Sequence, residues 1–120
     1  QTAIDLRDEQ NTNLSSKTLK KALAYIDEHY TSENLSLGTV ACEVQVGANY
    51  LSSVFSQNMQ KTFTEYISEK RMEKAKKLLK STELPTSEIA AQVGYKDPHY
   101  FSFVFKKTQG CSPREYRSSI

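Results

Sequence analysis

Apolar residues recur along most of this chain every three or four positions, with polar residues between them. That period is typical of amphipathic α-helices, which bury one stripe of side chains. The first stripe predicts a helix that begins at a Ser16 N-cap and ends at about Tyr30. The stretch 1–14 is polar, without a sustained apolar period. We therefore expect 1–14 to be a linker from an absent upstream domain, and Gln1 at the start suggests a piece of a longer protein.

Helix-capping residues predict where the other helices begin. Ser36 precedes a short apolar stripe, while T-x-x-E at 62–65 and S-x-x-E at 112–115 are capping boxes. Asp97 followed by Pro98 predicts another start, because aspartate caps backbone N–H groups and proline fits the first helical turn. Pro85 opens one more short helix. Since the chain has only 4 glycines and 3 prolines, we predict an all-α fold of about seven helices.

The chain also contains an internal repeat. Val40, Ala41, Val44 and Val46 recur 49 residues later as Ile89, Ala90, Val93 and Tyr95, and Tyr50, Leu51, Ser52, Val54 and Phe55 recur 50 residues later as Tyr100, Phe101, Ser102, Val104 and Phe105. Each copy predicts a short helix, a tight turn and a second helix, which together form a helix-turn-helix motif. We expect the first motif over 36–58 and the second over 86–108. The alternative is a helical bundle whose repeat is a coincidence.

A long helix is predicted between the two motifs, over 63–80. Its 18 residues span roughly 27 Å at about 1.5 Å per residue. Successive major grooves on one face of a DNA duplex are about 34 Å apart. A rigid linker helix of this length is therefore able to hold both motifs over adjacent grooves.

The net charge of +2 is a weak sign of nucleic-acid binding, but its distribution is uneven. Residues 1–60 carry 4 basic and 7 acidic side chains, whereas residues 61–120 carry 12 basic and 7 acidic ones. The basic half is suited to face phosphate, although such asymmetry is also common on protein surfaces.

Other features exclude several classes of protein. The two cysteines are far apart, which fits reduced thiols in a cytoplasmic protein and neither a disulfide framework nor a zinc site. No apolar run has the length of a membrane span, and no signal peptide is visible. The sequence has no catalytic triad, paired carboxylates or phosphate-binding glycine loop. We therefore expect a protein that is not an enzyme, with no metal and no cofactor.

Four stretches resemble the DNA-binding domain of the arabinose-regulator (AraC/XylS) family of bacterial transcription regulators. They are Y-L-S-S-V-F (50–55), F-T-E-Y-I-S-E-K-R-M-E-K-A-K-K-L-L (63–79), I-A-A-Q-V-G-Y-K-D-P-H-Y-F-S-F-V-F-K-K (89–107) and G-C-S-P-R-E-Y-R (110–117). The resemblance, which runs from about Ser16 to Arg117, implies a regulator that binds double-stranded promoter DNA and often RNA polymerase as an activator. The A-L-A-Y-I-D-E-H-Y opening resembles domains that follow the upstream regulatory domain of a two-component response regulator.

The resemblance also implies site residues, since exposed positions of the third and sixth helices of the family enter two major grooves. The matching positions here are Asn49, Ser52 and Ser53 in the first motif, and Pro98, His99, Ser102 and Phe103 in the second. The family pattern places Arg71 in the linker helix and Lys106 and Lys107 beside phosphate. Arg114 and Arg117 follow the second motif and are further phosphate candidates. A structural ion pair is the alternative for Arg71, and a solvated face for the lysines.

Helical spacing independently supports part of this site. Asn49, Ser52, Ser53, Gln57 and Gln60 are predicted to lie opposite the buried Leu51 and Phe55. Asparagine and glutamine pair with adenine, and serine bonds to several bases. Ordinary solvation is the alternative for these polar side chains.

Three departures from the family pattern affect the predicted DNA contacts of the two motifs. The segment 47–60 has no charged residue, although family members often carry a basic one near Ser53. The first motif is therefore expected either to bind weakly or to bind phosphate through the dipole of a helix N-terminus. Gln45 replaces the usual glycine of the first turn. Phe103 stands where a polar residue is common; it either presses on a thymine methyl or packs against the neighbouring helix.

Two other functions fit the same helices. A protein-interaction module would dock on polymerase or a partner regulator and would bind duplex DNA only non-specifically. An architectural DNA-binding protein would bind with strong salt dependence but little preference among sequences.

Overall fold

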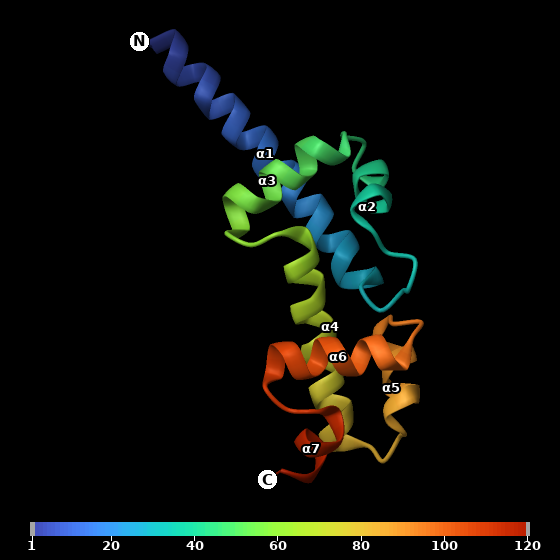
Figure 1. The fold of residues 1–120 in the computed structure, drawn as a ribbon. Helices are drawn as coiled ribbons and strands as arrows, with labels where there is room; N and C mark the ends of the chain where they lie inside the picture. The colour runs from blue at the N-terminus through green and yellow to red at the C-terminus, as the bar shows by residue number, and fades with distance from the viewer. Residues whose placement is uncertain (1, 120) are drawn as a thin grey trace. The chain divides into compact units, whose positions relative to one another are not determined.

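The computed structural model describes the backbone of residues 2–119 and the side chains of residues 16–119. Within residues 2–119 the chain forms seven α-helices and no strand, which confirms the predicted all-α fold (Figure 1). The helices are α1 (Thr2–His29), α2 (Leu37–Glu43), α3 (Ala48–Met59), α4 (Phe63–Ser81), α5 (Thr86–Val93), α6 (Pro98–Gln109) and α7 (Pro113–Ser118). Among the described residues, no helix is both long and apolar enough to cross a lipid bilayer.

The chain divides into two compact units, each with one helix-turn-helix motif. The first unit comprises residues 1–28 and 36–65, and the second comprises 29–35 and 66–120. In the first unit α2 and α3 pack together, and the buried side chains are Thr18, Ala22, Ile26, Val40, Ala41, Leu51, Val54, Phe55 and Phe63. The rings of Phe55 and Phe63 meet edge to face, with centroids 5.8 Å apart. This core fixes α3 through its apolar face and leaves its polar face in solvent.

The second unit has a larger core. It is formed by Met72, Ala75, Leu79, Ile89, Ala90, Val93, Tyr95, Phe101, Val104 and Phe105, with Leu78, Leu84 and Tyr116 packed against it. Figure 1 shows α5, α6 and α7 around the C-terminal part of α4, which supplies the first three of these residues. Like α3, α6 buries one stripe and exposes the other.

Both motifs turn through the same backbone geometry. Val46 donates its N–H to the carbonyl of Ala41 at 3.0 Å, and Tyr95 donates to the carbonyl of Ala90 at 2.9 Å. The residue before each donor is left-handed: Gln45 has φ 62° and Gly94 has φ 109°. Glycine adopts this conformation at position 94 without a steric penalty. The first turn forms with a glutamine in the left-handed position. Because Gln45 has a Cβ atom, this backbone conformation is sterically unfavourable there.

The predicted caps at Ser36, Thr62, Asp97 and Ser112 are confirmed. Ser36 accepts from the N–H of Thr39, and Asp97 accepts from the N–H of His99. Thr62 with Glu65 and Ser112 with Glu115 form reciprocal capping boxes, in which each glutamate accepts at 2.8 Å from the N–H of its partner. The hydrogen bonds from the backbone and hydroxyl of Ser112, together with nearby Lys106, lower the pKa of Glu115. These caps fix where α2, α4, α6 and α7 begin.

The predicted start of the first helix is wrong. Ser16 is not an N-cap but an exposed residue inside α1, which begins at Thr2. Apolar periodicity in a sequence predicts an amphipathic helix, and the polar stretch 1–14 gives no such signal. Between Thr2 and Ser16 the chain has neither glycine nor proline to stop a helix. The end of α1 at His29 lies one residue from the expected position.

We predict that Gln45→Gly raises the free energy of unfolding of the first unit by about 1 kcal/mol, because glycine adopts a positive φ without a steric penalty. Urea denaturation followed by circular dichroism measures the change. Gln57→Gly, inside the same unit and on an exposed helical position, is the matched control and should lower stability by about 1 kcal/mol. Equal losses in both variants would show that Gln45 is not strained.

Candidate nucleic-acid interface

The polar face of α3 carries the first group of predicted site residues. Asn49 and Ser53 are exposed and Ser52 is half-buried, whereas Leu51, Val54 and Phe55 are buried on the opposite side. The helix begins after Gly47, which makes no side-chain cap. Short polar side chains thus surround the start of α3, and both hydrogen-bond donors and acceptors are available there.

The equivalent face of α6 carries the second group. His99 and Phe103 are exposed, while Pro98 and Ser102 are half-buried. Proline occupies the first turn, as predicted, and the side chain of Asp97 caps it. The arrangement matches that of α3, but it includes an imidazole and an apolar ring in place of small polar groups.

Phe103 does not pack against a neighbouring helix, so that alternative is wrong. Its side chain is 60% exposed. Its ring contacts come from its own helix: the Tyr100 centroid lies 6.4 Å away, and Lys107 Nζ lies 5.9 Å from the Phe103 centroid. The exposed ring is therefore available for contact with a ligand, and contiguous exposed apolar patches are a feature of interaction surfaces.

Tyr100 is a candidate that the sequence reasoning missed. It is 56% exposed, and its counterpart Tyr50 in the first motif is 41% exposed. The repeat contained the signal, since a tyrosine stands at the same place in both copies. The repeat by itself shows only that this position belongs to the motif. Its exposure instead places Tyr100 beside Phe103 on the surface of α6.

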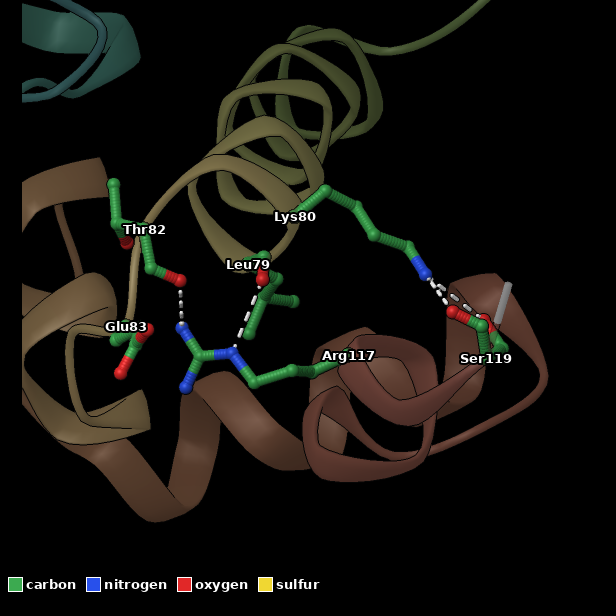
Figure 2. Close-up of a pocket in the computed structure, with 6 residues that line it drawn as sticks. All are labelled: Leu79, Lys80, Thr82, Glu83, Arg117 and Ser119. Atoms are coloured by element: carbon green, nitrogen blue, oxygen red, sulfur yellow. Dashed lines mark hydrogen bonds between the residues drawn. The ribbon is translucent and has the colours of Figure 1, made fainter.

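The predicted phosphate-binding side chains fall into two groups. Lys106, Lys107 and Arg114 are exposed near the end of α6 and in α7. Arg117 is half-buried instead: Nε donates to the carbonyl of Leu79 at 3.0 Å, and Nη2 donates to that of Thr82 at 3.1 Å. Figure 2 shows this guanidinium bonded to Leu79 and Thr82 around the end of α4, while Lys80 extends away from it and donates to the carbonyl of Ser119. Arg117 therefore has a structural role, which its place in the sequence did not reveal.

Arg71 resembles Arg117 in this respect. Its side chain is half-buried, with Nε donating to the carbonyl of Tyr30 at 2.7 Å and Nη2 donating to that of Ser32 at 2.9 Å. Its Cζ lies 5.0 Å from the centroid of the Tyr95 ring. The partners of Arg71 are thus two carbonyls and a ring, rather than the carboxylate of the expected ion pair.

The sequence matches a family model described as a helix-turn-helix domain, over residues 40–119. The arabinose operon regulatory protein of Escherichia coli is 34% identical over 100 residues, which cover 83% of this chain and 34% of that protein. The chain belongs to the AraC/XylS-type helix-turn-helix family. Sequence-specific DNA binding in transcription regulation is the function of this domain.

Solved structures agree with this assignment. The C-terminal domain of AraT, a response regulator from Geobacillus stearothermophilus, is 44% identical with a TM-score of 0.82, and the match covers 83% of each chain. The DNA-binding domain of AdpA, solved in complex with a target DNA, is 21% identical with a TM-score of 0.78, over 83% of this chain and 89% of that one. The second likeness shows the fold. Since the chain spans about a third of the length of the arabinose regulator, it corresponds to one part of that protein.

Proposed function

We propose that this AraC-type domain reads a bipartite site in double-stranded promoter DNA, with α3 in one major groove and α6 in the next. The observation that supports this proposal is the repeated exposed face: two copies of one motif present equivalent positions of their second helices to solvent. Because the two motifs differ in sequence, the half-sites need not be palindromic. Their centres are expected about 10–10.5 bp apart, one turn of the duplex.

Some of the exposed side chains are assigned to sequence preference, and others are assigned to general affinity for DNA. Base contacts are assigned to Asn49, Ser52 and Ser53 on α3, and to Pro98, His99, Ser102 and Phe103 on α6. Contacts to phosphate are assigned to Lys106, Lys107 and Arg114, whose charges are exposed. Phosphate contacts fix position and give salt-dependent affinity, while base contacts give specificity. The α3 half contributes less affinity, because no charged residue lies in 47–60.

The whole protein is proposed to be a cytoplasmic transcription regulator with an upstream regulatory domain. The likeness to the C-terminal domain of the response regulator AraT supports a two-component receiver as that domain. Contact with RNA polymerase, as in an activator, is a further part of the proposal. None of the described side chains is assigned to polymerase.

Selection from a random duplex pool at about physiological ionic strength tests the proposed function. We expect enrichment of two conserved blocks separated by one helical turn, with the block read by α6 the more strongly enriched. Enrichment of one block alone would show that α3 does not choose bases. Binding with steep salt dependence and no enrichment would favour an architectural protein, and the absence of binding would favour a protein-interaction module.

Phe103→Arg tests the proposed thymine contact. An apolar ring favours the thymine methyl, so its loss should relax preference at one base pair and weaken the best site about tenfold, within the range for a single specific contact. Phe103→Leu keeps an apolar surface and is the control, expected to retain a preference for thymine. Selected sites identical to those of the wild type in the arginine variant would disprove the thymine contact.

Lys106→Gln tests the phosphate contacts. The slope of log K against log salt concentration should fall by about one, because one fewer counterion is released. Affinity should weaken by a similar factor for all sequences, without a change in the selected site. Lys77→Gln, which removes a positive charge from an exposed position on α4, is the matched control and should leave the slope unchanged. A changed base preference in Lys106→Gln would assign that lysine to a base instead.

A further inference from the structure

The guanidinium of Arg71 fills the space beside the turn of the second motif. A Cβ atom added to Gly94 would lie 2.9 Å from Nε and 3.0 Å from Cζ of Arg71, closer than side chains normally approach. Glycine therefore suits position 94 for two reasons: it adopts a φ of 109°, and it has no Cβ atom that would collide with the Arg71 guanidinium. The same Nε atom donates to the carbonyl of Tyr30, and the adjacent Nη2 donates to that of Ser32. The position of the guanidinium is thus set by these two hydrogen bonds and by its close approach to Gly94.

The first motif lacks this arrangement. The equivalent of Gly94 is Gln45, whose side chain is exposed, and the equivalent of Tyr95 is Val46. A valine offers no aromatic face on which a guanidinium can stack. The two turns share their hydrogen bond and their left-handed residue, so the turn itself does not require an arginine. Arg71 and the aromatic platform under it, the Tyr95 ring, therefore have a role that is specific to the second motif.

Ring contacts lead from this platform to the surface of α6. The Tyr95 ring, 8% exposed, lies 5.7 Å from that of Phe101 in the core and 5.9 Å from that of Tyr100, centroid to centroid. Tyr100 in turn lies 6.4 Å from Phe103. Contacts at these distances are typical of interacting aromatic pairs. Arg71, Tyr95, Tyr100 and Phe103 therefore form an unbroken series from a backbone-anchored cation to an exposed ring.

We infer that Arg71 is a positioning residue for base recognition: by holding the Tyr95 ring, it sets where Tyr100 and Phe103 stand on α6. The inference rests on the proposed function, in which the exposed face of α6 reads bases. Arginine suits this role because its planar group both donates a fork of hydrogen bonds and stacks on a ring, whereas lysine is a point charge that cannot do both. Direct contact of Arg71 with phosphate is the competing role.

The test compares Arg71→Lys and Arg71→Gln with the wild-type chain in duplex selection and salt titration. A positioning role predicts that both variants lose discrimination in the α6 block by about 2- to 30-fold, the range for substitutions in a coupled network. Discrimination in the α3 block and the salt slope should stay as in the wild type. A phosphate contact predicts instead that Arg71→Gln lowers the slope by about one, and that neither variant changes base preference.

A second pair of variants removes the platform while keeping Arg71. Tyr95→Val, which copies the first motif, should relax the α6 block as Arg71→Lys does. Tyr95→Phe keeps the ring and should leave the selected site unchanged. Urea denaturation establishes that each variant is folded under the binding conditions. If Arg71→Lys does not fold, the tyrosine pair alone decides the matter, because it leaves the arginine and its hydrogen bonds in place.

Each outcome has a distinct meaning. Folded Arg71→Lys or Tyr95→Val chains with an unchanged α6 block would overturn the positioning role and leave the proposed function intact. An equal loss of affinity for both blocks, without a change in preference, would show that Arg71 acts on stability alone. A wild-type chain that enriches no α6 block would overturn the proposed function, and this inference with it.

Discussion

Each helix-turn-helix motif depends on one hydrogen bond across its turn. The N–H of Val46 or Tyr95 reaches the carbonyl of an alanine five residues back, and the chain closes this loop only if the residue before the donor is left-handed. The small alanine is buried in both copies, at position 41 and at position 90. The turn sets the angle at which the second helix leaves the first. The orientation of α3 and α6, and so of every exposed side chain on them, follows from this local constraint.

The sequence predicted the local features well because local chemistry produces them. Capping boxes and an aspartate followed by proline involve residues close along the chain, and α2, α4, α6 and α7 begin where the predicted caps stand. The start of α1 was missed because no sustained apolar period marks it in the sequence. The core of the second unit joins Met72 of α4, 1% exposed, to residues of α5 and α6, and spacing within one helix does not predict such contacts between helices.

The two arginines show the limit of prediction for the site. Arg71 and Arg117 look like surface cations in a basic half of the chain, yet each donates Nε and Nη2 to two carbonyls about 35 to 41 positions away in the sequence. Every residue has a backbone carbonyl, so the sequence does not show which carbonyl an arginine side chain will contact. Both arginines bond to backbone near the C-terminal end of a long helix, where the last carbonyls lack partners within the helix. The exposure of Asn49 and Ser53 on α3, in contrast, followed directly from helical spacing.

The presence of both motifs in one chain has a thermodynamic consequence. In the proposed complex, once one helix occupies its groove, binding of the other becomes intramolecular, at an effective concentration that reaches the millimolar range for short connections. A contact too weak to be detected alone would then add measurably to the lifetime of that complex. Under this proposal the uncharged face of α3 needs little affinity of its own, because it would act by avidity: it would slow dissociation from sites that carry both halves and leave encounters with half a site brief.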